Sequence, residues 1–341
     1  MSTGRYDRYD EDDIRIRPSR HGSRPRSKDR PSHAEAVDGR VLAVDRGRYH
    51  VLVDDVMLTA IKSRNLGRKS IVVGDSVGLV GDVSGAKDTM ARIVRQNPRT
   101  SVLRRTADDT DPVERVIVAN ADQLVIVTAL ANPEPRPRMI DRCLVAAYDA
   151  GLTPILLLTK SDLVSPDELL SLYGDLDVEV LVTHIHDGAT EGIDTVRRAL
   201  SQKVSVFVGH SGVGKSTLVN ALVPDASRAT GSVNVVTGRG RHTSSSAVAL
   251  PLPDDTGWVI DTPGVRSFGL AHVDLDRIID HFPELEKGTA ECPRACSHDE
   301  ADCGLDEFVA ANAQTQPNLT QRLESLRRLL RSRALEEDAA R

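Results

Sequence analysis

Short apolar runs dominate the chain between about residues 35 and 99. Val, Leu and Ile gather there in brief stretches that are separated by Gly and Asp. Runs of this kind are typical of β-strands joined by tight turns. About five of them in so short a segment predict a small β-barrel. The strands are expected at residues 39–45, 49–54, 70–75, 77–81 and 91–94.

The predicted barrel fits the OB-fold, an architecture that often binds nucleic acid. A fold alone does not establish a function, because one architecture hosts many kinds of site. Tyr49 is the only aromatic residue between residues 35 and 99, so the segment lacks an aromatic platform on which bases would stack.

From about Val113 the pattern changes to apolar strands that alternate with amphipathic helices. This alternation predicts a mostly parallel sheet with helices on both faces. Strands are expected at residues 115–119, 123–128, 154–159, 178–182, 204–208 and 258–261, and helices at 138–150, 166–173, 192–200 and 217–222.

The pattern changes again from about Asp274. A short helix is expected at 275–281, a Cys/His cluster follows, and a basic helix is expected at 320–333. With little apolar content, this last region is expected to need a metal ion in order to fold. The predicted parts are a tail at 1–35, the barrel at 36–100, an α/β domain at 101–272 and a small α-helical domain at 273–341.

Composition changes this picture little. The net charge of −6 does not by itself suggest a nucleic acid partner. Residues 14–30, however, hold seven cations against one anion and almost no apolar side chain, which predicts disorder. Two interpretations stay open for this segment: a solvating tail, or a flexible arm that contacts phosphate backbones.

The sequence contains no apolar run of the eighteen or so residues that a membrane helix needs, and no secretory signal is visible. Its four cysteines, three of them clustered, do not resemble a disulfide framework. Cys143 lies in a helical pattern and is expected to be a buried core residue. The expected location is therefore the cytoplasm.

A phosphate-binding loop stands between the strand at 204–208 and the helix at 217–222. Its glycines allow the backbone N–H groups to point at phosphates, Lys215 is expected to reach the β- and γ-phosphates, and the Ser216 hydroxyl to bind Mg²⁺. The predicted phosphate-binding residues are Gly209, His210, Ser211, Gly212, Val213, Gly214, Lys215, Ser216 and Thr217.

A guanine-recognition motif ends the strand at 154–159 and consists of Thr159, Lys160, Ser161 and Asp162. The Asp162 carboxylate can accept hydrogen bonds from the N1–H and the amine of guanine, a pair that adenine does not offer. The Lys160 stem is expected to pack along the base. A second base-contacting segment is expected near residues 183–185, although it departs from the usual Ser-Ala-Lys type.

Switch residues follow the phosphate loop. Asp261 is expected in the Mg²⁺ shell, Gly264 to sense the γ-phosphate, and Thr243 to contact both. Val265 stands where Ras-like GTPases carry the Gln that orients the attacking water, so His242 is the candidate for that catalytic task. The motifs thus run base, phosphate, switch. In Ras-like GTPases the phosphate loop comes first, so this order indicates a circularly permuted P-loop GTPase.

A metal site is predicted at Cys292, Cys296, His298 and Cys303. Three thiolates and one imidazole within twelve residues suit a closed, tetrahedral structural Zn²⁺ site.

Taken together, these motifs resemble the ribosome small-subunit-dependent GTPase A family (RsgA, also called YjeQ). The likeness covers about residues 36–330 and rests on the motif order, Gly-His-Ser-Gly-Val-Gly-Lys-Ser-Thr-Leu, Gly-Arg-Gly-Arg-His-Thr, Asp-Thr-Pro-Gly-Val-Arg and the Cys/Cys/His/Cys site. It implies an OB-fold, a permuted GTPase domain and a zinc-binding helical domain. The cysteine spacings are each one residue shorter than is usual in the family, and the segment after Cys303 looks compressed.

The resemblance implies a monomeric GTPase that binds the small ribosomal subunit late in its assembly and hydrolyses GTP slowly unless the subunit is present. The barrel and the arginines of the last helix are expected to contact rRNA, mostly at phosphates. Val265 keeps open a second reading, an RNA-binding scaffold that holds GTP as a structural ligand. A small-molecule kinase is disfavoured by the Thr-Lys-x-Asp and Asp-x-x-Gly motifs. The arginines of the last helix that are expected to contact rRNA are Arg322, Arg327, Arg328, Arg331 and Arg333.

Overall fold

The computed structural model describes most of the chain after the N-terminal segment, and the described residues from Glu35 onward belong to one compact unit. The described residues are 33, 35–67, 71–106, 114–173, 176, 178–186, 189–223, 247–253, 256–262, 276–316 and 318–339.

The predicted barrel is confirmed. Its strands pair in the order β1-β2-β3-β5-β4, and β4 pairs back with β1, which closes the barrel. Apolar side chains that alternate along the strands fill its interior, among them Val41, Val51, Leu79 and Ile93. The strands are β1 (Val37–Asp45), β2 (Arg48–Val53), β3 (Val56–Lys62), β4 (Ser76–Gly81) and β5 (Ala91–Gln96), with the 3₁₀ turn η2 (Arg64–Leu66) after β3.

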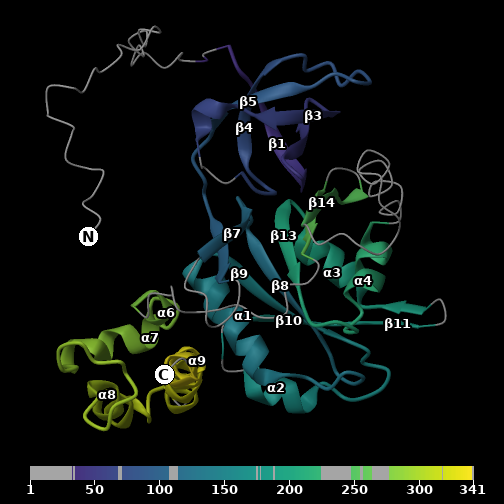
Figure 1. Cartoon of the computed structure of the whole chain (residues 1–341). Coiled ribbons are helices and arrows are strands. Elements are labelled where there is room, and N and C mark those ends of the chain that lie inside the picture. The colour runs from purple at the N-terminus through teal and green to yellow at the C-terminus, as the bar shows by residue number, and fades with distance from the viewer. Residues whose placement is uncertain are drawn as a thin grey trace, which may run out of the picture. The chain divides into compact units, whose positions relative to one another are not determined.

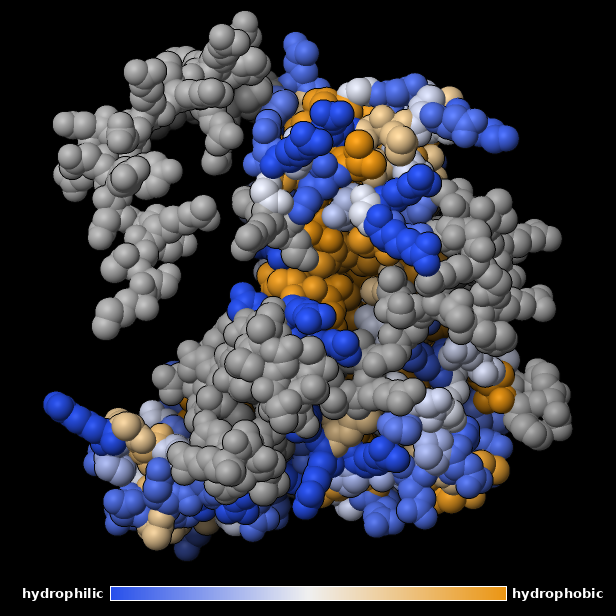
Figure 2. Space-filling view, viewed as in Figure 1, coloured by the Kyte–Doolittle hydropathy of each residue, from blue (hydrophilic) through white to orange (hydrophobic). Residues whose placement is uncertain are grey.

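The barrel surface mixes apolar and hydrophilic residues (Figure 2). Val37, Val56, Met57 and Met90 are exposed, whereas Tyr49 is buried in the interior. The described part of the barrel therefore presents no aromatic side chain on which a base could stack, as the sequence predicted.

The strand expected at 70–75 is wrong, and β3 was not predicted. Residues 71–75 form a turn in which Val73 makes only an isolated bridge to Val118. The Asp75 carboxylate is fully buried and holds this turn, since it accepts hydrogen bonds from the Val72 backbone N–H (2.8 Å) and from Arg99 (2.7 and 2.8 Å). The apolar run is buried because it forms a linker, and in the sequence a buried apolar linker has the same pattern as a buried strand.

Gly74 in this turn gives a stability prediction. Its φ is +88°, and a Cβ there would lie 1.9 Å from the Ala119 carbonyl oxygen. Gly74→Ala should lower the free energy of unfolding by about 3 kcal/mol or more, because left-handed strain adds to a backbone clash. Gly47→Ala is the matched control, since Gly47 has a φ of +82° but nothing within 4 Å, and should cost about 1 kcal/mol. Chemical denaturation measures both, and equal losses would contradict the clash.

Along the chain, a pair of strands lies between the barrel and the strands of the central sheet. It consists of β6 (Val102–Thr106) and β7 (Glu114–Ala119), which pair antiparallel. The run at 115–119 was expected to belong to the alternating α/β pattern. It lies instead against the barrel linker, where the Ala119 N–H donates to the Val73 carbonyl oxygen at 3.0 Å.

The central sheet has helices on both faces, as predicted (Figure 1). Neighbours in the order β10-β9-β8-β13-β15 are parallel, and β14 adds antiparallel beside β15. Helix α1 packs on one face, and α3 and α4 on the other. The elements are β8 (Gln123–Ala129), α1 (Pro137–Asp149), β9 (Thr153–Thr159), α2 (Asp167–Tyr173), β10 (Glu179–Val182), β11 (His184–His186), β12 (Ala189–Glu191), α3 (Ile193–Leu200), β13 (Lys203–Val208), α4 (Lys215–Leu222), β14 (Val248–Pro251) and β15 (Gly257–Asp261).

Strand β14 was not predicted, and it joins two parts of the fold. It pairs with β15 along its length and with β1 at Ala43 and Val248. The barrel strands and the central strands thereby form one continuous sheet.

The C-terminal helices have a substantial apolar core, so the expectation of little apolar content is wrong. Phe282, Leu285, Leu305, Leu326 and Leu329 are all at most 1% exposed and belong to the core that also contains α1. Among the described residues, no helix has both the length and the apolar character needed to cross a membrane. The elements are α6 (Asp276–Ile279), α7 (Pro283–Glu286), η4 (Lys287–Glu291), α8 (Gly304–Asn312), which was not predicted, and α9 (Leu319–Ala339).

Candidate nucleotide and metal sites

The phosphate loop lies where the sequence placed it, between β13 and α4. Gly212 and Gly214 have φ values of +84° and +90°, which favour glycine. A Cβ on Gly209 would lie 2.5 Å from the Val127 carbonyl oxygen. The loop lines a cavity of about 420 Å³, with Val213 alone turned into the core. The lining residues are Gly209, His210, Ser211, Gly212, Gly214, Lys215, Ser216 and Thr217.

The structure brings Lys215 and Asp261 together. Strands β13 and β15 are parallel neighbours, so their carboxyl ends meet at one edge of the sheet. The Lys215 Nζ donates to Asp261 Oδ1 at 2.6 Å and to the Thr262 carbonyl oxygen at 3.3 Å. Thr262 is fixed in turn, because its Oγ1 donates to the Phe207 carbonyl oxygen at 2.7 Å.

Thr159 has a role that the sequence did not reveal. Its side chain is buried, and Oγ1 donates to the carbonyl oxygen of Val213 in the phosphate loop at 2.6 Å. This hydrogen bond joins the guanine-recognition motif to the phosphate loop. Thr159 therefore acts on the phosphate loop directly, and its part in guanine recognition stays a prediction.

A third segment, between β8 and α1, also lies at this site. Lys160 has a φ of +58°, and its Nζ donates to the Asn132 carbonyl oxygen. The Arg136 guanidinium lies 3.0 Å from His210 Nε2, while His210 Nδ1 lies 3.1 Å from the Ser211 carbonyl oxygen. These partners assign the Nδ1–H tautomer to His210. The sequence could have predicted that this segment lies near the phosphate loop only if it had shown that β8 lies between β9 and β13.

The segment at 183–185 lies beside the recognition motif, as expected. His184 Nδ1 is 3.5 Å from the Ser161 Oγ and 3.4 Å from a Glu191 carboxylate oxygen. The Thr183 backbone N–H donates to the Leu158 carbonyl oxygen at 2.8 Å, which fixes the segment to the end of β9. Asp162 is exposed at this edge.

Four residues of the predicted switch and catalytic machinery lie outside the described residues: His242, Thr243, Gly264 and Val265. Their roles stay predictions.

The Cys/His cluster forms a compact ligand set. The ligand atoms of Cys292, Cys296, His298 and Cys303 all lie within 4.8 Å of one another. Cys292 Sγ is 3.6 Å from His298 Nδ1 and 3.9 Å from Cys303 Sγ. Tetrahedral bonds of about 2.3 Å place two sulfur ligands about 3.8 Å apart, so these distances fit a four-coordinate metal ion. The shorter cysteine spacing is therefore compatible with metal binding.

Without a bound metal ion, the thiolate forms of the cysteines in this cluster are electrostatically unfavourable. Burial raises the pKa of Cys292, and it raises the pKa of Cys296 to about 12. Hydrogen bonds, first from the Ser297 backbone N–H and then from Cys296, lower the pKa of Glu300 to about 2. A metal ion would have to displace the thiol protons, which couples its binding to pH.

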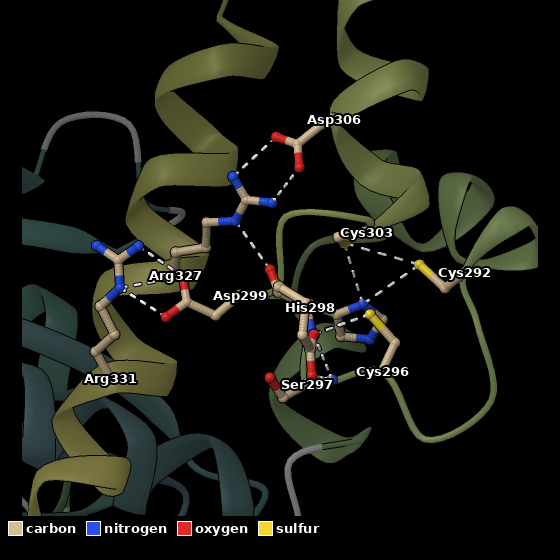
Figure 3. Close-up of polar contacts among 10 residues, drawn as sticks. Cys292, Cys296, Ser297, His298, Asp299, Cys303, Asp306, Arg327 and Arg331 are labelled. Carbon is tan, nitrogen blue, oxygen red and sulfur yellow. Dashed lines mark hydrogen bonds and ion pairs between the residues drawn. The ribbon is translucent and has the colours of Figure 1, made fainter.

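Two arginines of α9 hold the segment that carries His298 (Figure 3). Arg327 donates from Nε to the His298 carbonyl oxygen at 2.9 Å and from both terminal nitrogens to Asp306 at 2.9 and 2.7 Å. Arg331 contacts the Asp299 carboxylate, with its shortest distance 2.6 Å. The hydrogen bonds to Asp306 raise the pKa of Arg327.

Two further arginines of α9 also have partners inside the protein. Arg322 pairs with Glu284 and lies 4.6 Å from the centre of the Phe282 ring. Arg328 lies 3.3 Å from the buried Asp141 of α1 and donates to the Leu172 carbonyl oxygen at 3.0 Å. The described arginines of this helix are thus engaged in structural contacts, and the side chain of Arg333 lies outside the described residues.

Comparisons with known proteins agree with this architecture. A family model described as RsgA GTPase matches residues 96–271. The small ribosomal subunit biogenesis GTPase RsgA of Gemmatimonas aurantiaca is 38% identical over 256 residues, which cover 74% of this chain and 82% of that protein. The protein of the same name from Pseudomonas putida is 40% identical over 250 residues, covering 71% and 70%.

Solved structures show the same fold. The crystal structure of YjeQ from Thermotoga maritima matches with a TM-score of 0.62 and 25% identity, over 87% of this chain and 98% of that one. YloQ, a circularly permuted GTPase, matches in fold with a TM-score of 0.59 and 21% identity, over 88% and 97%.

Proposed function

Because the chain belongs to the RsgA GTPase family, we propose that it hydrolyses GTP to GDP and phosphate and assists late maturation of the small ribosomal subunit. One observation carries the reaction: the phosphate loop, the recognition motif and Asp261 meet at the carboxyl ends of neighbouring parallel strands. The partner is supported by the name that curated relatives share, small ribosomal subunit biogenesis GTPase.

Lys215 and Asp261 would exchange partners when nucleotide binds. In the structure they pair with each other at 2.6 Å. Lys215 would turn to the β- and γ-phosphates, which leaves Asp261 free to join Ser216 and Thr243 around Mg²⁺. Mg²⁺ would neutralise phosphate charge there. The backbone N–H groups of residues 209–217 would hold the phosphates.

Guanine recognition would rest on Asp162, with Lys160 lying along the base. The Asn132 carbonyl that binds the Lys160 Nζ supports this role, because it holds the stem of the side chain in place. Ser161 would complete the motif beside residues 183–185, and Thr159 would set the distance between base and phosphate sites through Val213.

His242 would orient the attacking water, since Val265 cannot, and Gly264 would report the γ-phosphate. Zn²⁺ would be the structural ion at Cys292, Cys296, His298 and Cys303, because three thiols and one imidazole are a donor set that zinc prefers.

The protein would act as a monomer in the cytoplasm. The barrel would supply rRNA contacts, mostly to phosphates. The α9 arginines named above are less suited to this role than expected, because their guanidinium groups already bind acidic side chains and carbonyls.

GTP turnover should rise at least about tenfold when purified small ribosomal subunits are added to the full chain. Phosphate release measures this, and large subunits are the control. His242→Ala should lose the stimulated turnover and keep GTP affinity nearly intact. A rate that small subunits leave unchanged would favour the alternative, an RNA-binding scaffold that holds GTP as a structural ligand.

A further inference from the structure

We propose that Arg327 is a positioning residue of the metal site, which sets the geometry of the Cys/His cluster by holding His298 against the start of α8. This role concerns how the metal ligands are arranged and does not depend on GTP hydrolysis.

The contacts of Arg327 join the two halves of the ligand set. Its Nε donates to the His298 carbonyl oxygen at 2.9 Å, and its terminal nitrogens bind both Asp306 oxygens. Asp306 lies in the first turn of α8, and its own N–H donates to the Cys303 carbonyl oxygen at 3.1 Å. One side chain therefore connects the residue that presents the imidazole to the turn that presents a thiol (Figure 3).

The segment before α8 needs such an anchor. His298 and Ala295 have φ values of +65° and +59°, which side chains other than glycine rarely adopt. The strain is of order 1 kcal/mol for each residue and has to be offset by contacts nearby. A fixed carbonyl at His298 orients the peptide plane that follows it, and so directs Nδ1 toward Cys292 and Cys303 at 3.6 and 3.9 Å.

Arg331 adds a second, weaker contact one turn later on the same face of α9. It binds Asp299, the residue after His298, but its side chain is 61% exposed, compared with 17% for Arg327. Exposed ion pairs contribute little, so Arg327 is expected to dominate.

Arg327 would act mainly by orienting the ligands. Arg327 and Asp306 form a bidentate pair that is neutral as a whole, and Arg327 also interacts with the Cys303 thiol, which adds to the rise that Asp306 causes in the pKa of Arg327. Partners in the outer shell of a metal site typically change metal affinity by 10- to 100-fold, because they fix the direction of a ligand.

The test compares Zn²⁺ affinity in full-length variants by competition with a chromophoric chelator. Arg327→Gln should bind Zn²⁺ roughly 10- to 100-fold more weakly. With Co²⁺ in place of Zn²⁺, it should also lose the intense absorption of a tetrahedral thiolate site. Arg327→Lys should remain impaired, since an ammonium group cannot reach the His298 carbonyl and both Asp306 oxygens together.

Arg322→Gln is the matched control. Arg322 stands on the same helix and also bridges a carboxylate, Glu284, and a backbone carbonyl, that of His281, away from the cluster. Its variant should keep native Zn²⁺ affinity and the Co²⁺ spectrum. The proposal is overturned if Arg327→Gln binds Zn²⁺ as native does, if Arg322→Gln weakens binding equally, or if Arg327→Lys restores native affinity.

Discussion

Replacement of Asp162 by asparagine should weaken GTP binding by roughly 10²- to 10⁴-fold and make the protein prefer xanthosine triphosphate. The loss corresponds to two charge-assisted hydrogen bonds, at about 1.5–3 kcal/mol each. An asparagine can accept a hydrogen bond from the N1–H of xanthine and donate one to its O2. Guanine carries an amine in place of that oxygen, so the asparagine N–H would face another donor. Titration with fluorescent GTP and xanthosine triphosphate measures the exchange of specificity.

Asp167→Asn provides the control for this prediction. Asp167 is exposed in the first turn of α2 and accepts a hydrogen bond from the Ser165 hydroxyl at 2.7 Å. Its variant removes the same charge from the same surface region and should leave both affinities unchanged. Native GTP affinity in Asp162→Asn would remove the base-recognition assignment, and loss of both nucleotides together would indicate a damaged fold.

Removal of the metal should release residues 292–303 while the helical core stays folded. A bound metal ion would hold the thiols of Cys292, Cys296 and Cys303 together. Helix α9, by contrast, packs through Leu326 and Leu329 against the core that it shares with α1. Chelation should therefore increase hydrogen exchange strongly at 292–303 and little at 319–330. Exchange followed by mass spectrometry measures both segments.

Thiol labelling supplies the internal control. After chelation three cysteines should react with an alkylating reagent, while Cys143, which is 2% exposed within α1, stays protected. Labelling of Cys143 at the same rate would mean that the whole unit unfolds without metal. That outcome would restore the sequence-based expectation that the ion is needed for folding.

Proton release from the thiols on metal binding also fixes the direction in which metal affinity changes with pH. Burial raises the pKa of Cys292 and of Cys296 above the ordinary thiol value, so both are protonated in the metal-free protein near neutral pH. Each gives up a proton when a metal binds, and apparent affinity should fall by at least about 100-fold for each pH unit of acidification.

Much of the fold followed from residue patterns, and one of the misses has a clear physical cause. Runs such as 204–208 and 154–159 were correct because parallel strands buried on both faces are continuously apolar. The run at 70–75 is similarly apolar in the sequence, but residues 71–75 form a turn around the buried Asp75. The sequence could show that this segment is buried, but it could not show that Arg99, 24 residues along the chain, binds the Asp75 carboxylate that holds the turn.

The sequence by itself predicted the chemistry of this protein: phosphate loop, base motif, motif order and metal ligands. Each of these is local, because glycines, a lysine or closely spaced thiols impose their geometry within a few residues. Only the tertiary structure decided which groups hold these motifs in place. Thr159 binds the phosphate loop, Arg136 meets His210, and Arg327 holds His298, across separations of 54, 74 and 29 residues. Such pairs depend on which strands and helices become neighbours, and packing of the whole chain settles that.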